Sequence, residues 1–94
     1  MSQQRYDMIQ ARLSTALNPI KLELADDSHL HAGHAGAKEG RGHYRVTIVS
    51  TQFAGLRPIA RHQLVYRSLG ELMQTDIHAL SITAYTPEEA GANA

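Results

Sequence analysis

The sequence predicts an α+β domain in which helices cover one face of a three-stranded mixed sheet, in the order α-β-β-α-β-α. Two observations predict strands: apolar and charged residues alternate over 20–24, and β-branched residues are concentrated in 43–50. A third observation predicts the helical layer, because apolar residues recur at helical spacing between Pro58 and Met73. The order strand, helix, strand in the second half favours a right-handed crossover with parallel pairing.

The first helix is expected over residues 4–17, with an apolar face formed by Tyr6, Ile9, Leu13 and Leu17. It is expected to stop at Asn18-Pro19, because the residue before a proline is disfavoured in the α conformation. The strand over 20–24 follows, and its alternation predicts three inward side chains: Ile20, Leu22 and Leu24.

A long segment that extends to about Gly42 is predicted to be a loop that begins at Asp26-Asp27-Ser28. Three of the six histidines fall at its start, as His29, His31 and His34. Loops of this length in a compact domain are usually functional or disordered. Because neutral imidazole is a common metal ligand, the histidines make this loop a candidate metal-binding segment, with a solvated loop as the alternative.

The strand over 43–50 is expected to direct Tyr44, Val46 and Ile48 to one face. A turn over 51–56 follows, in which Phe53 is expected to fill the core and Gly55 to adopt a positive φ. The next helix has Pro58 in its first turn and is expected to reach Met73. Its predicted sheet-facing residues are Ile59, Val65, Leu69 and Leu72.

The last strand is expected over 77–85. His78 has the parity of Leu80 and Ile82, which predicts that it opens this strand on the core face. From the residue alone, a hydrogen-bonded structural histidine is the plainer interpretation of His78. The following Thr86-Pro87-Glu88-Glu89 is typical of a helix start, with threonine as N-cap and glutamate three residues later.

Length and composition limit the function classes. The 94 residues predict a single domain over 1–94, with a core at about 5–90 and a short tail at 91–94. The net charge of zero argues against a role based mainly on phosphate neutralisation. The chain contains no cysteine, so it cannot by itself hold an iron–sulfur cluster through thiolates. No secretion signal or membrane span is recognised, which favours a cytoplasmic protein. The isolated chain is expected to be a monomer.

Five short motifs occur in one order along the chain. They are Asp26-Asp27-Ser28 with His31 and Gly36, His43-Tyr44-Arg45-Val46-x-Ile48-Val49-Ser50, Phe53-x-Gly55, Arg61-His62-x-Leu64-Val65-Tyr66 and Ile77-His78-Ala79-Leu80-Ser81. Together they resemble the BolA family over roughly residues 8–90. The resemblance implies a class II KH-like fold and a protein without enzymatic activity.

The resemblance also implies a partner and a cofactor. BolA-like proteins pair with monothiol glutaredoxins and share a bridged 2Fe–2S cluster, to which glutaredoxin and glutathione supply thiolates. No cofactor is then expected on the isolated chain. The histidine that such proteins supply from the start of the last strand matches His78. The second ligand, from the loop, matches His31 by spacing, with His34 as its substitute and His29 also close by.

A second class of function is DNA-binding regulation of transcription, which the resemblance also includes. Arg57, Arg61 and Arg67 on the second helix would contact phosphates, and the affinity is expected to be weak. Net neutrality and the lack of a Gly-x-x-Gly loop with basic flanks weigh against it. The plainer interpretation of the three arginines is a solvated helix face.

Overall fold

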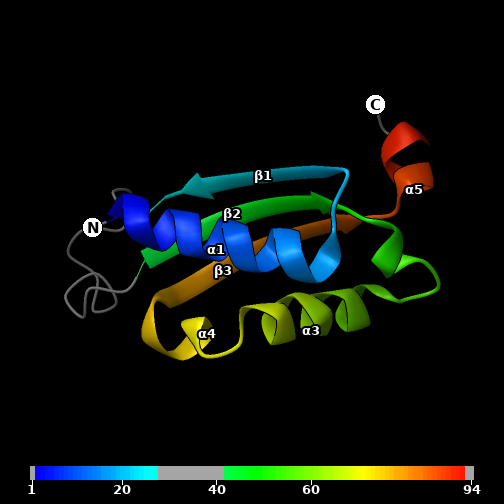
Figure 1. Ribbon diagram of the computed structural model, residues 1–94. Helices are drawn as coiled ribbons and strands as arrows, with labels where there is room; N and C mark the ends of the chain where they lie inside the picture. The colour runs from blue at the N-terminus through cyan, green and yellow to red at the C-terminus, as the bar shows by residue number, and fades with distance from the viewer. Residues whose placement is uncertain (1, 28–41, 93–94) are drawn as a thin grey trace.

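The computed structural model describes residues 2–27 and 42–92, and the statements below refer to these ranges. Figure 1 shows helices α1 and α3 side by side across one face of the sheet. The elements in chain order are α1 (Ser2–Leu17), β1 (Lys21–Asp26), β2 (Gly42–Val49), the 3-10 helix η2 (Thr51–Phe53), α3 (Pro58–Leu69), α4 (Leu72–Thr75), β3 (Ile77–Tyr85) and α5 (Pro87–Ala92). The predicted α+β architecture is confirmed, with two additional short helices, η2 and α4.

The sheet has the order β1-β2-β3. Strands β1 and β2 are antiparallel, and their register runs from Lys21 opposite Val49 to Asp26 opposite Tyr44. Strands β2 and β3 are parallel, with Tyr44 opposite Leu80. The predicted mixed sheet is therefore confirmed, because one pair of strands is antiparallel and the other is parallel. The parallel pair is joined by a connection that contains α3 and α4.

The core lies between the sheet and helices α1 and α3. Its fully buried side chains include Ile9, Leu13, Leu17, Val46, Ile48, Phe53, Val65 and Leu69. Phe53 is completely buried, as the sequence predicts for the only phenylalanine. On the opposite face of the sheet Glu23, Ser81 and Thr83 are exposed, so the helices cover one face alone.

Two isoleucines predicted to point into the core are exposed: Ile20 and Ile59 each have an exposed fraction of 69%. Ile20 follows the turn at Asn18, whose φ is 44°, and comes before the first residue of β1. Strand alternation therefore does not yet apply to it. Ile59 lies six residues before Val65, which at 3.6 residues per turn directs it about 120° away from that buried side chain.

The second long helix is shorter than predicted. It ends at Leu69 and not at Met73, because Gly70 adopts φ 57° and ψ −128°. The Gly70 N–H donates to the Tyr66 carbonyl at 3.0 Å, which satisfies one of the carbonyl groups at the helix end. The separate helix α4 then carries Leu72, which is buried as predicted.

The predicted start of the last helix is confirmed. Glu89 accepts from the Thr86 N–H at 2.8 Å, and Thr86 Oγ1 accepts from the Glu89 N–H at 3.2 Å, which is the reciprocal capping box. Gly55 has φ 78°, also as predicted. None of the helices in the described ranges is long and apolar enough to span a membrane.

Candidate functional site

Three strand ends meet at one end of the sheet, which lies at the left in Figure 1. There β1 ends at Asp26, β2 begins at Gly42 and β3 begins at Ile77. Because β2 and β3 are parallel neighbours, their first residues are brought together. The second residue of β2 is His43, and the second residue of β3 is His78.

The two histidine rings are in contact. Their centroids are 4.9 Å apart and their planes are tilted by 48°. His43 is only 8% exposed, whereas His78 is an exposed residue. One member of the pair is therefore held inside the fold while the other faces solvent.

The prediction that His78 lies on the core face is wrong. Ile77 occupies the core position at the start of β3 with an exposed fraction of 1%, and His78 is exposed. The physical reason is a register shift between Gly42 and His43, which pairs Gly42 with Ile77 but His43 with Ala79. The shift interrupts the alternation of side chains from which parity was counted.

Main-chain hydrogen bonds fix this end of the sheet. The Gly42 N–H donates to the Asp76 carbonyl at 2.9 Å, and the Asp27 N–H donates to the His43 carbonyl at 2.8 Å. Arg45 adds a two-point contact with the Asp27 carboxylate at 3.0 and 3.3 Å. Since the Arg45 side chain is 63% exposed, this pair contributes little stability.

Helix α1 is attached to the same end of the sheet. The Arg5 Nε donates to the Asp76 carboxylate at 3.3 Å, and Asp76 immediately precedes β3. Nearby, the Tyr44 hydroxyl is buried. Burial and then the Asp26 charge raise the pKa of Tyr44, against a smaller opposing effect of Arg5, so the phenol stays neutral at neutral pH.

The loop histidines His31 and His34, and His29 with them, lie outside the described residues. Their predicted role as ligands stays a prediction. Within residues 2–27 and 42–92, no three histidine, cysteine, aspartate or glutamate side chains are grouped so that they could hold a metal ion. The described part of the chain thus offers one exposed imidazole, that of His78, and any cluster bound there needs its other ligands from elsewhere.

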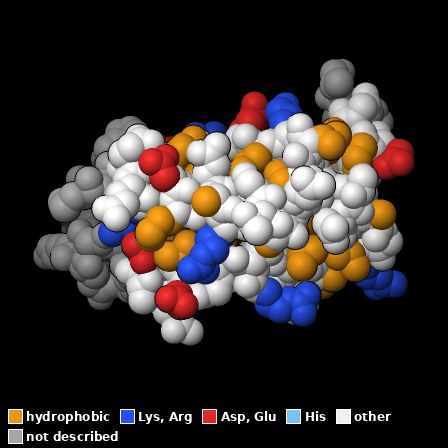
Figure 2. Space-filling model, viewed as in Figure 1, with side chains coloured by type: hydrophobic (Ala, Val, Ile, Leu, Met, Phe, Trp, Pro, Cys, Tyr) orange, Lys and Arg blue, Asp and Glu red, His pale blue; other side chains and the backbone are white. Residues whose placement is uncertain are grey.

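The three arginines proposed for phosphate contact have different environments. Arg61 donates to the carbonyls of Leu56 and Ala84 at 2.8 and 3.0 Å, and to the Glu89 carboxylate at 2.6 and 3.1 Å. Its guanidinium therefore connects α3 to β3 and α5 through these hydrogen bonds. Arg57 and Arg67 are exposed, and Figure 2 shows basic side chains along the lower rim of the molecule, where α3 lies.

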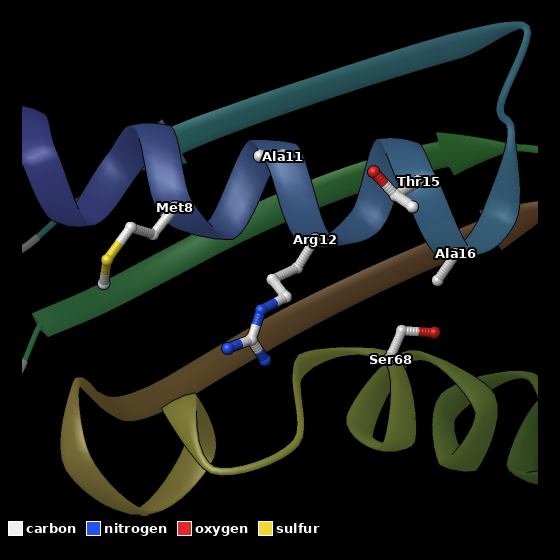
Figure 3. A pocket seen from close by; sticks show the side chains of 6 residues that line it. All are labelled: Met8, Ala11, Arg12, Thr15, Ala16 and Ser68. Carbon is white, nitrogen blue, oxygen red and sulfur yellow. The ribbon is translucent and has the colours of Figure 1, made fainter.

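A groove of about 410 Å³ lies between α1 and α3 (Figure 3), and neither histidine of the pair lines it. It is lined by Met8, Ala11, Arg12, Thr15, Ala16 and Ser68. The Arg12 guanidinium crosses it, and Nη1 donates to the Leu69 carbonyl at 3.1 Å. This contact ties α1 to the end of α3, and the lining contains no nucleophile paired with a base.

The partner of His78 was not predicted from the sequence. A signal was present, since two parallel neighbouring strands were expected to begin at His43 and at Ile77, which places both histidines at one end of the sheet. The register shift decides which side chains touch there, and periodicity does not reveal it.

The chain is similar to several known proteins. The BOLA1 protein of Arabidopsis thaliana, named as chloroplastic, is 42% identical over 89 residues, which cover 92% of this chain and 56% of that protein. The DNA-binding transcriptional regulator BolA of Vibrio cholerae is 41% identical over 83 residues, which cover 88% of this chain and 76% of that protein. The chain thus spans little more than half the length of the Arabidopsis relative.

Solved structures agree with this similarity. The BolA domain of SufE1 from Arabidopsis thaliana matches with a TM-score of 0.81 and 40% identity, over 90% of this chain and 94% of that one. BolA1 from the same plant matches with a TM-score of 0.77 and 41% identity, over 89% and 93%. The family model described as BolA-like protein covers residues 13–89. That span contains the whole sheet and the histidine pair, and on this basis the chain belongs to the BolA-like protein family.

Proposed function

We propose that this protein is an adaptor that pairs with a monothiol glutaredoxin and shares a 2Fe–2S cluster with it, in iron–sulfur cluster trafficking or iron homeostasis. His78 supplies an imidazole to one iron, and glutaredoxin and glutathione supply thiolates. The observation that carries the proposal is the exposure of His78 at the start of β3, beside a fixed strand end.

The ligand inventory supports a shared site. The chain has no cysteine, and its described residues hold no three-ligand group of their own. A lone exposed imidazole suits a ligand completed by a partner, because a cluster needs four protein or thiol ligands. His31, with His34 as its substitute, remains the proposed second ligand from the loop.

Imidazole in place of thiolate changes what a bound cluster supplies. Histidine ligation raises the reduction potential of a 2Fe–2S centre relative to an all-cysteine one. The work of this chain is to present the imidazole and a docking surface, and neither task requires a catalytic group. We therefore propose no enzymatic activity.

The test is coexpression of the full chain with a monothiol glutaredoxin, followed by visible absorption and circular dichroism of the purified complex. Wild type is expected to give a heterocomplex spectrum that differs from that of the glutaredoxin homodimer. His78→Ala is expected to lose it. His62→Ala is the matched control, because His62 lies on α3 and not at the strand ends. A heterocomplex spectrum retained in His78→Ala would refute the assignment.

The loop ligand is tested in the same assay. His31→Ala is expected to weaken the spectrum less than His78→Ala, and His31→Ala with His34→Ala is expected to weaken it further. The reason is that a substitute ligand on the same segment compensates at the cost of ordering that segment. Loss in His34→Ala with none in His31→Ala would reverse the choice of ligand.

A second function is favoured by the name of the Vibrio cholerae relative, a DNA-binding transcriptional regulator. For this chain the exposed Arg57 and Arg67 are the proposed phosphate contacts, while Arg61 is engaged with Glu89. Binding is expected to be weak and to decrease steeply with salt. Tight binding at physiological salt that survives Arg57→Ala with Arg67→Ala would contradict these contacts.

A further inference from the structure

We infer that His43 is a positioning residue for His78: its buried ring holds the exposed imidazole in the orientation in which it meets the iron. The inference rests on the proposed function and adds a residue to it. It concerns the contact between two rings and not the ligation itself.

The contact has the geometry of a packed pair. Aromatic rings prefer centroid separations of about 4.5–7 Å in offset or tilted arrangements. The rings of His43 and His78 are 4.9 Å apart with an interplanar angle of 48°. His78 therefore has one side occupied by a neighbour while the residue as a whole remains exposed.

His43 is suited to hold a neighbour because it is itself fixed. It lies on β2, the central strand of the sheet, and is only 8% exposed. Its carbonyl accepts from the Asp27 N–H at 2.8 Å, and the preceding Gly42 N–H donates to the Asp76 carbonyl at 2.9 Å. These bonds connect His43 to β1 on one side and to the start of β3 on the other.

Burial disfavours His43 as an iron ligand. The residue is only 8% exposed and its Nε2 atom is fully buried, so a metal outside the protein reaches that nitrogen only if the ring leaves its packed position. His78 requires no such movement, because it is already exposed. The two histidines therefore have different roles: His78 is exposed to the partner, and His43 packs against it from inside the fold.

Positioning has a thermodynamic effect. An exposed side chain at a strand end has several staggered rotamers, and binding must select one of them. A ring packed on one side removes part of that freedom before the partner arrives, as outer-shell groups do for other metal ligands.

The first test uses the full chain without a partner, so it does not depend on the cluster. Ring ¹³C and ¹⁵N relaxation of His78 is measured in wild type, His43→Ala and His43→Phe, with His62→Ala as control. His43→Ala is expected to increase the motion of the His78 ring. His43→Phe keeps an aromatic ring at that position and is expected to restore the restriction. Thermal unfolding of each variant sets a temperature at which all are folded.

The second test uses the complex with a monothiol glutaredoxin. His43→Ala is expected to weaken cluster retention against a chelator by about 10–100-fold, the range for loss of outer-shell partners. His43→Phe is expected to stay close to wild type. Pulsed electron paramagnetic resonance with ¹⁵N-histidine then counts the imidazoles on the reduced cluster, and that count is expected to be unchanged in His43→Phe.

The other possible outcomes would overturn either this inference or the proposed function. Loss of one coupled imidazole in His43→Phe would make His43 a ligand and overturn the inference. Unchanged His78 motion and unchanged cluster retention in His43→Ala would overturn it as well. A heterocomplex spectrum that survives His78→Ala removes the proposed function, while the ring motion measured on the isolated chain still reports on the contact.

Discussion

Ser50 joins three parts of the fold through one hydroxyl group. It is completely buried, and its Oγ donates to the Leu17 carbonyl at 2.6 Å and accepts from the Gln52 N–H at 3.1 Å. The first bond satisfies a carbonyl at the end of α1, and the second caps η2. Ser50→Ala removes both bonds without adding volume.

The expected cost follows from the two bonds. Loss of a cap costs about 0.5–2 kcal/mol, and a buried carbonyl left without a partner costs about 1–3 kcal/mol. Together they predict a loss of about 1.5–5 kcal/mol in the free energy of unfolding for Ser50→Ala. For a domain of this size, that corresponds to a decrease in Tm of about 6–40 °C.

The assay is urea denaturation followed by far-ultraviolet circular dichroism, with Ser81→Ala as the control. Ser81 is exposed on the open face of β3, so its replacement is expected to change stability by less than about 0.5 kcal/mol. Equal midpoints for the two variants would refute the claim that the Ser50 hydroxyl connects α1 to η2. A changed slope with an unchanged midpoint would refute it too, since the native contact would then not be the cause.

Three further predictions test other contacts. Gly70→Ala is expected to cost about 1–3 kcal/mol in urea denaturation because φ is 57°, whereas Gly91→Ala, with no atoms near its added Cβ, is expected to be neutral or stabilising. Leu69→Ala is expected to cost about 2–5 kcal/mol and Ile59→Ala less than about 0.5 kcal/mol, since only Leu69 is buried; equal costs would contradict the orientation of α3. The hydrogen bond from Arg61, helped by the Thr86 N–H, lowers the pKa of Glu89 from 4.5 to about 2, so its stabilisation is complete above pH 4.5 and is lost as the pH falls towards 2. Thermal unfolding of Glu89→Gln is therefore expected to depend less on pH in that interval than wild type, and identical profiles would show that the pair is not formed.

Sequence signals that act within one helix, strand or turn predicted the fold well, because they do not depend on how the elements pack together. The capping box at Thr86 and Glu89, the positive φ of Gly55 and the burial of Phe53 all follow from such signals, and all are confirmed. Alternation along β2 also placed Tyr44, Val46 and Ile48 correctly in the core. Each of these features depends on chemistry within one element.

The errors come from places where one element meets another. Ile20 lies just before β1, so its orientation is set by the turn at Asn18 and not by the strand. The spacing of apolar residues continues from α3 into α4, so periodicity alone did not show that Gly70 separates them. The orientation of His78 depends on the pairing of β3 with β2, which no single segment encodes.

The position of His78 results from a chain of backbone contacts that begins at Gly70. Gly70, with its positive φ, ends α3, and α4 then starts at Leu72. At the end of α4 the Asp76 N–H donates to the Leu72 carbonyl at 2.9 Å. Asp76 then accepts from Gly42 and pairs with Arg5, which fixes the chain two residues before His78. If α3 continued without a break, Asp76 would lose its contacts with Gly42 and Arg5, and His78 would no longer contact His43. The glycine therefore matters to the proposed ligand although it lies outside the candidate site.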